Sequence, residues 1–269
     1  VMIYNLAKTV ASGSLVANEE AEAPALVKEV SQGKEYWHRV IERKPTLLLV
    51  LSLIVILIGG IVEMVPTFLI ESNVPTIAAV KPYTPLELEG RDLYIKEGCV
   101  GCHSQMVRPF RSETERYGEY SKAGEFVYDH PFLWGSKRTG PDLAREGTSK
   151  LFKQDSWHYY HLVKPEEMTQ GSIMPPYPWL ASNELNTSST ADKINAMRTL
   201  GVPYPEGYEN QALKDLQAQA QKIADNLDKE GVRLEDGSKV AANTEIVALI
   251  AYLQRLGTDI TKSETANNQ

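Results

Sequence analysis

The sequence predicts a mainly α-helical fold in which one membrane-spanning helix near the N-terminus precedes a helical domain. Residues 46–62 are almost purely apolar, a helix-start signal stands at Thr84, and apolar residues recur at helical spacing from Ile246 to Leu256. No run of alternating polar and apolar residues indicates a sheet. We therefore divide the chain into an N-terminal segment with a linker (1–45), a transmembrane helix (46–70), a tether (71–83), one domain (84–260) and a flexible tail (261–269).

Composition and charge exclude several classes of protein. The chain has 269 residues and a formal net charge of -7, so it lacks the basic surface that binds nucleic acid. Its two cysteines, Cys99 and Cys102, lie in one short motif, which excludes a disulfide framework. The pair is therefore either a redox dithiol or the attachment point of a cofactor.

The N-terminal segment contains two different patterns. Residues 1–10 are typical of the last turns of a helix that ends near Lys8, as in a processed chain or the tail of a fused upstream membrane subunit; a frayed terminus has the same pattern. Residues 11–34 are small, polar and acidic, and a proline and two glycines interrupt any helical period. We expect this stretch to be a flexible linker.

The apolar run that begins at Thr46 contains the stretch LLLVLSLIVILIGGIV, which has no polar face. Continued to Ile70, the run is long enough to cross a hydrocarbon core of roughly 30 Å. The missing polar face favours a membrane helix over a buried core helix. Glu63, near the outer end of the span, is expected to have a structural role at the membrane interface, facing a partner subunit.

Charge on the two sides of the span predicts its orientation. Four basic residues precede it: Lys34, Arg39, Arg43 and Lys44. No Lys or Arg occurs from Glu63 to Val80, so we expect the N-terminus in the cytoplasm and the domain outside it. Prolines at 75, 82 and 85 indicate an extended tether between the membrane and the domain.

The domain begins and ends with predicted helices. Thr84-Pro85-Leu86-Glu87 combines a capping threonine, a proline and a glutamate, which predicts a helix running to about Glu97. The last helix is expected to stop at Gly257. Between them we expect helices at 157–163 and 212–227, and a loop at 110–147, which is rich in glycine and charge.

The chemistry of the domain is indicated by Cys99-Val100-Gly101-Cys102-His103, which directly follows the first helix. This spacing is the attachment signature of haem c: two thiols bind one porphyrin and the adjacent imidazole binds its iron. A zinc site would need a second ligand pair. A thioredoxin-type dithiol would need a strand before the motif.

A second axial ligand of the iron is expected at Met174, in the proline-stiffened stretch Gly171 to Pro178. Met106 is too close to His103 to reach the opposite face of a haem, and Met168 lacks a rigid setting. The alternative for Met174 is gap-filling in the core. Of the remaining histidines, His130, His158 and His161 are expected to be solvent-facing or hydrogen-bonded, and His38 lies before the span.

Several residues resemble class I cytochromes c. Gly90 and Tyr94 on the first helix, and residues 249–253 on the last, are similar to the helix crossing of that family. Thr139-Gly140-Pro141-Asp142-Leu143 resembles the segment after its haem site, which implies that the Pro141 carbonyl accepts a hydrogen bond from His103 Nδ1. The resemblance implies a class I cytochrome c-like domain with a long loop insertion at 181–242, whose role we leave unassigned.

A narrower resemblance is to the mono-haem subunit (FixO or CcoO) of cbb3-type cytochrome c oxidases. It rests on residues 102–111, Trp134-Gly135, residues 174–180 and Gly59-Gly60-Ile61-Val62-Glu63, within 45–180 and 244–256. The resemblance implies one covalent haem c in an inner-membrane subunit with a periplasmic haem domain. It also implies electron transfer from a di-haem cytochrome subunit to a haem-copper catalytic subunit that reduces oxygen to water, with no catalytic site in this chain itself.

We expect residues 104–137 to contact that catalytic subunit. This stretch is dense in arginines, glutamates and aromatics, although a solvated loop has a similar composition. Arg108, five residues after His103, is expected to bind a haem propionate, in this chain or in the neighbouring subunit. Residues 1–10 resemble the last helix of the catalytic subunit. The end of that helix and the N-terminal side of the span are both expected in the cytoplasm, which is consistent with a fused gene product.

Three other functions remain as alternatives. The cytochrome subunit of a nitric oxide reductase also has one span and one haem, but residues 104–135 argue against it. A haem peroxidase needs an open iron position, which Met174 would close. A structural subunit with an incidental haem is the third alternative.

Overall fold

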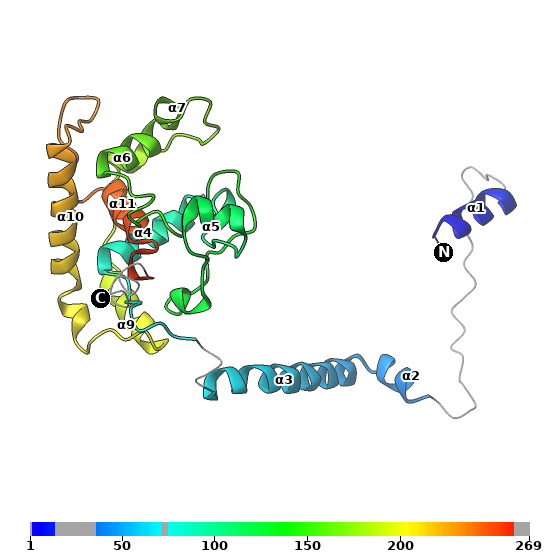
Figure 1. Ribbon diagram of the computed structural model, residues 1–269. Helices are drawn as coiled ribbons and strands as arrows, with labels where there is room; N and C mark the ends of the chain where they lie inside the picture. The colour runs from blue at the N-terminus through cyan, green and yellow to red at the C-terminus, as the bar shows by residue number, and fades with distance from the viewer. Residues whose placement is uncertain (1, 14–35, 71–74, 261–269) are drawn as a thin grey trace. The chain divides into compact units, whose positions relative to one another are not determined.

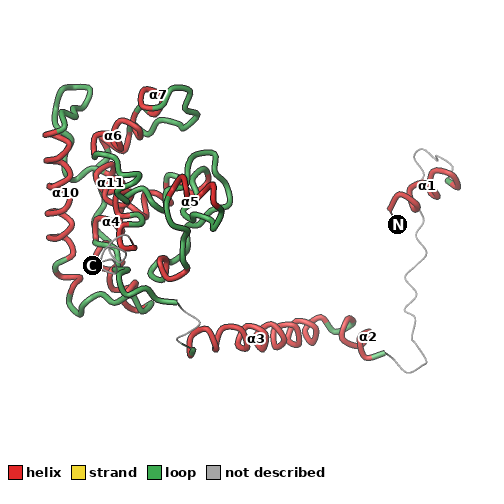
Figure 2. The backbone as a smooth tube through the Cα atoms, in the orientation of Figure 1, coloured by secondary structure: helices red, strands yellow, loops and turns green. Residues whose placement is uncertain are grey.

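The computed structural model describes residues 2–13, 36–70 and 75–260, and within them the chain is helical (Figures 1 and 2). The helices are α1 (Met2–Ser12), α2 (Trp37–Glu42), α3 (Pro45–Leu69), α4 (Pro85–Lys96), η2 (Cys99–Gly101), α5 (Arg111–Tyr117), η3 (Ala123–Phe126), α6 (Asp155–Val163), α7 (Pro165–Met168), α8 (Trp179–Ser182), α9 (Thr190–Thr199), η4 (Tyr208–Asn210), α10 (Ala212–Lys229) and α11 (Glu245–Arg255). The described residues form no strand, only an isolated bridge between Glu184 and Thr244. Most of the predicted linker, tether residues 71–74 and the predicted tail at 261–269 lie outside the described residues.

The chain divides into two compact units, Val1–Val65 and Pro66–Gln269. The first contains α1, α2 and most of α3. Among the described residues, α3 is the one helix that is long and apolar enough to cross a membrane. Its large apolar side chains, such as Leu49, Val55 and Ile56, are exposed, as lipid-facing side chains must be. The predicted membrane helix at 46–70 is therefore present, within one residue at each end.

The second unit is built on the crossing of α4 and α11, which make the most extensive helix contact in the chain. The predicted capping box begins α4: Glu87 N donates to Thr84 Oγ1, and Thr84 N donates to Glu87 Oε2. A Cβ atom at Gly90 would lie 2.0 Å from the carbonyl oxygen of Ala248, so only glycine permits this approach. Tyr94 and Tyr252 meet beside the crossing, with ring centroids 5.4 Å apart.

Two helices of the insertion at 181–242, α9 and α10, pack against α4. Figure 1 shows α10 running alongside α4 and α11. Thr190 Oγ1 and Lys193 Nζ from α9 each lie 2.6 Å from a carboxylate oxygen of Glu89. These two side chains of α9 shield Glu89 from solvent, so the insertion buries this face of α4.

One expectation about the loops was wrong. Residues 110–147 are not loop throughout, because α5 and η3 form within them. The helix α5 is too short to be stable alone, so tertiary contacts must hold it. Its Glu113 and Tyr117 are both 6% exposed, and Gly118 ends it with a φ of +112°.

Candidate functional site

An apolar cavity of about 80 Å³ lies beside the α4–α11 crossing and opens to solvent. Four of the six predicted site residues line it: Cys99, His103, Pro141 and Met174. Leu143, Leu162, Leu249 and Leu253 supply much of the remaining wall. The fold thus gathers residues far apart in the sequence around one apolar space.

The two cysteines lie on one turn that directly follows α4. Gly98, with a φ of +76°, turns the chain out of α4 into η2, which begins at Cys99. Cys99 is half-buried and lines the cavity, and burial raises the pKa of its thiol to about 11. Cys102 is exposed and is not among the residues that line the cavity. Both thiols are free of disulfide bonds.

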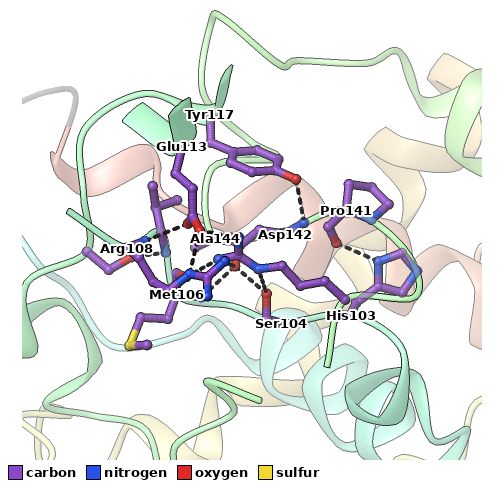
Figure 3. Close-up of polar contacts among 12 residues, drawn as sticks. His103, Ser104, Met106, Arg108, Glu113, Tyr117, Pro141, Asp142 and Ala144 are labelled. Carbon is purple, nitrogen blue, oxygen red and sulfur yellow. Dashed lines mark hydrogen bonds and ion pairs between the residues drawn. The ribbon is translucent and has the colours of Figure 1, made fainter. Parts of the chain in front are cut away.

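His103 is oriented by Gly140 and Pro141, which lie against its ring. Its Nδ1 lies 2.8 Å from the Pro141 carbonyl oxygen, which is the contact implied by the resemblance to class I cytochromes c (Figure 3). A carbonyl can only accept, so Nδ1 carries the proton and Nε2 keeps the lone pair that a metal needs. A Cβ at Gly140 would come within 2.3 Å of the His103 ring, so a larger residue there would displace the imidazole from this position.

Met174 lies in the loop between α7 and α8. Its backbone N–H donates to Ser172 Oγ at 3.2 Å, and the Tyr177 N–H anchors the loop by donating to the Leu162 carbonyl at 2.8 Å. Neither Met106 nor Met168 is among the residues that line the cavity. Of the three methionines considered as ligands, Met174 is the one that the fold brings to His103.

His158 departs from expectation more than His161 does. Both line the cavity, and His158 is only 3% exposed. Neither the buried Nε2 of His158 nor the buried Nδ1 of His161 has a hydrogen-bond partner within the described ranges. The expectation of a solvent-facing or hydrogen-bonded side chain was therefore wrong for His158. His161 is partly exposed, and both histidines line the cavity because α6 turns them towards it. Burial lowers the pKa of both imidazoles, that of His158 to about 4.

These unpartnered nitrogens allow a test of whether haem fits the cavity. A buried polar atom without a partner costs about 1–3 kcal/mol, so the two histidines indicate that the cavity receives a further group. The lining supplies apolar walls, the Cys99 thiol, the His103 imidazole with an unprotonated Nε2, and the Met174 thioether. Haem matches this set, since it is a largely apolar disc around a metal that binds nitrogen and sulfur.

Arg108, the sixth predicted site residue, lies outside the cavity lining. Its backbone N–H donates to Glu113 Oε2 at 2.8 Å, and its Nε donates to Glu113 Oε1 (Figure 3). The guanidinium therefore already has a carboxylate partner within its own segment. Its expected contact with a haem propionate stays a prediction.

A polar network behind His103 was not found by sequence reasoning. Arg138 Nε donates to Ser104 Oγ at 2.7 Å, its Nη2 donates to the Met106 carbonyl at 2.7 Å, and its Nη1 lies 2.7 Å from Glu113 Oε1. Asp142 Oδ2 accepts from Ser104 Oγ at 2.6 Å and from the Met106 N–H at 2.8 Å (Figure 3).

This network joins the segment after His103 to the segment that contains Pro141. It therefore holds the histidine and its hydrogen-bond acceptor at a set separation. Asp142 could have been found from its place directly after Pro141 in the quoted motif. No signal in the sequence marked Arg138 or Glu113 as its partners.

Comparison with known families gives one match. Residues 38–260 match the family described as Cytochrome C oxidase, mono-heme subunit/FixO. The match includes α3, the cavity and the insertion at 181–242. No curated protein matches the chain.

Proposed function

Because the chain belongs to the mono-haem subunit family of cytochrome c oxidases, we propose that it carries electrons through one covalently bound haem c to the haem-copper catalytic subunit of a cbb3-type oxidase. The observation that supports this most is the cavity in which Cys99, His103 and Met174 meet. A bound haem iron would supply a one-electron carrier. The chain has no catalytic site of its own in this proposal.

Each residue of the site has a separate role in holding the group. The Cys99 and Cys102 thiols form the two thioether links, and His103 Nε2 is the proximal ligand. The Pro141 carbonyl keeps His103 in the required tautomer and orientation. The Met174 thioether would supply the other ligand to the iron, which would raise the reduction potential relative to histidine and leave no position open to oxygen or peroxide.

The distribution of charge supports one placement in the membrane. Arg39, Arg43 and Lys44 lie just before α3, and this group of basic residues favours a cytoplasmic N-terminal side and a periplasmic haem domain. In this proposal α3 crosses the inner membrane of the cell. A di-haem cytochrome subunit is the electron donor in this proposal.

Covalent attachment can be tested on denaturing gels stained for haem. The purified chain should give a haem-stained band, and Cys102→Ser should weaken or remove it because one thioether is lost. Met168→Leu, outside the cavity lining, is the control and should keep the band. Haem that acid acetone extracts completely from the intact protein would contradict the proposal.

The ligand set can be tested by spectroscopy. Oxidised protein should show the weak near-infrared band of a methionine–iron bond, and Met174→His should remove the band and lower the reduction potential. Reduced wild-type protein should not bind carbon monoxide, since both axial positions are filled. A band that persists in Met174→His would assign the ligand to another methionine.

A further inference from the structure

A second hollow lies on the outer side of the polar network, between α5 and residues 138–141. It has a volume of about 460 Å³ and is open to solvent, and its lining includes Arg108, Glu113, Arg116, Tyr117, Arg138 and Pro141. We call it the arginine groove. Pro141 links it to the haem site, because the carbonyl of Pro141 lies 2.8 Å from His103 Nδ1.

The charges in the arginine groove are unevenly paired. Glu113 is shared by Arg108 and Arg138, and Arg138 also contacts Asp142 at 3.3 Å. Arg116 is exposed and has no acidic partner among the residues that the structure describes; its guanidinium lies 5.0 Å from the Tyr117 ring centroid. The groove therefore carries net positive charge with one guanidinium available. A guanidinium prefers a carboxylate, which it binds through two parallel hydrogen bonds.

We propose that the arginine groove binds a carboxylate side chain of the catalytic subunit, with Arg116 as its main ligand. Docking there places the partner against the segments that carry His103 and Pro141. This inference rests on the proposed function, because it names the partner-binding residue of the same electron-transfer unit. Arg108 is the weaker candidate for this role, because Glu113 already pairs with its guanidinium.

Two observations favour a permanently bound subunit over a transient electron donor. The chain's formal net charge is -7, so its overall field repels an acidic partner at long range, and the arginine groove attracts one only within about 10 Å. Phe110, directly before α5, is 56% exposed and has the Arg108 guanidinium 5.5 Å from its ring centroid. Arginines beside an exposed aromatic are typical anchors of stable interfaces.

Charge reversal in the intact membrane complex provides the first test. Arg116→Glu should reduce recovery of this chain with the catalytic subunit, or slow electron transfer between them, by about ten-fold or more. Arg111→Glu makes the same charge change on the same helix, but Arg111 is outside the groove lining and its side chain is 90% exposed. Because Arg111 lies in the expected contact segment but outside the groove, this control should have a much smaller effect than Arg116→Glu. Both variants should keep the wild-type haem spectrum.

Zero-length cross-linking provides the second test. In Arg116→Lys, carbodiimide treatment of the membranes should join the new amine to the partner's carboxylate as an amide, with loss of water to the carbodiimide. The expected product is a haem-stained adduct with the catalytic subunit, absent from Arg111→Lys. An adduct with the electron donor instead would overturn the assignment of the partner.

The inference and the proposed function fail in different ways. If Arg116→Glu assembles and transfers electrons as Arg111→Glu does, and no adduct forms, the arginine groove is not the docking site, while a normal haem spectrum leaves the proposed function intact. If the purified wild-type chain holds no haem, the proposed function itself fails.

Discussion

The α4–α11 crossing and the segment that contains α5 flank the same site, yet they are held by different forces. At the crossing, Gly90 lets the two backbones approach, and the buried side chains of α11 facing it, such as Leu249 and Ile250, are apolar. Around α5, ion pairs between largely buried side chains hold the segments together: Arg145 pairs with Glu125, and Arg138 pairs with Glu113 and Asp142. Close packing positions one wall of the cavity, and ion pairs position the residues behind His103.

This difference follows from what each region has to bury. α11 is buried mainly through apolar side chains, so it loses little free energy to desolvation. α4 also buries Glu87, Glu89 and Arg91, each of which has a charged partner. The segment around α5 has few apolar residues, and its charged groups are buried only because each has a partner. The first region should therefore be sensitive to added volume, and the second to loss of a single charge.

The largest effect is expected from removing one member of a buried ion pair that is joined by two hydrogen bonds. Arg145 contacts Glu125 through two nitrogens at 2.8 and 3.0 Å, and the two side chains are 3% and 7% exposed. Arg145→Met should lower the free energy of unfolding by about 3–5 kcal/mol, because Glu125 is left buried and unpaired. Denaturant unfolding of the detergent-solubilised chain measures this. Adding Glu125→Gln should recover part of the loss; a double variant less stable than the single one would contradict the explanation.

The next effect tests the helix crossing. In Gly90→Ala the new Cβ would lie 2.0 Å from the Ala248 carbonyl oxygen, so α4 and α11 must separate. We expect a loss of about 3 kcal/mol, at the upper end for an overpacked core. Thermal unfolding followed by circular dichroism measures it. Gly101→Ala, which places a Cβ where no atom lies within 4 Å, is the control, and equal melting of the two variants would show that the crossing tolerates a methyl group.

A smaller, pH-dependent effect is expected at Glu113. Burial raises the pKa of this carboxyl, but hydrogen bonds from Arg138 and the Arg108 N–H outweigh burial and lower it from 4.5 to about 2. The ionised form is therefore favoured by folding, so its stabilisation is complete above about pH 4.5 and is lost as the pH falls towards 2.

Glu113→Gln should accordingly cost about 2 kcal/mol at pH 7 and much less near pH 2. Unfolding midpoints of wild type and variant across this range measure the difference. Glu115→Gln on the exposed side of α5 is the control and should leave the profile unchanged. A pH-independent difference between wild type and Glu113→Gln would mean that the network does not depend on the charge.

The smallest effect is expected on the exposed surface of α5. Arg111 and Glu115 form an ion pair at 2.7 Å, but their side chains are 90% and 63% exposed. Arg111→Gln should change the free energy of unfolding by only about 0.3–0.5 kcal/mol, and less in high salt. A loss comparable to that of Arg145→Met would show that burial is not what distinguishes the charges of this segment.

Much of the site could be predicted because its signals are local. The cysteine–histidine motif, the capping box at Thr84 and the proline-stiffened loop of Met174 each lie within a few residues of sequence. His158 was misjudged for the opposite reason. Whether His158 faces solvent or a cavity depends on how α6 packs in the fold, which the residues next to His158 in the sequence do not indicate.

By itself, the sequence determined the helical fold class, the membrane helix, the helices that begin and end the domain, and the family. These follow from periodicity, helix caps and one short motif, all of which are properties of neighbouring residues. Only the tertiary structure decided which charges are buried. Glu89 looks like a solvated position on α4, but α9, about a hundred residues later, covers it with Thr190 and Lys193. Likewise Arg138, Glu113 and Asp142 become one network only when the fold brings their segments together, because a pairing between distant segments leaves no local pattern in either of them.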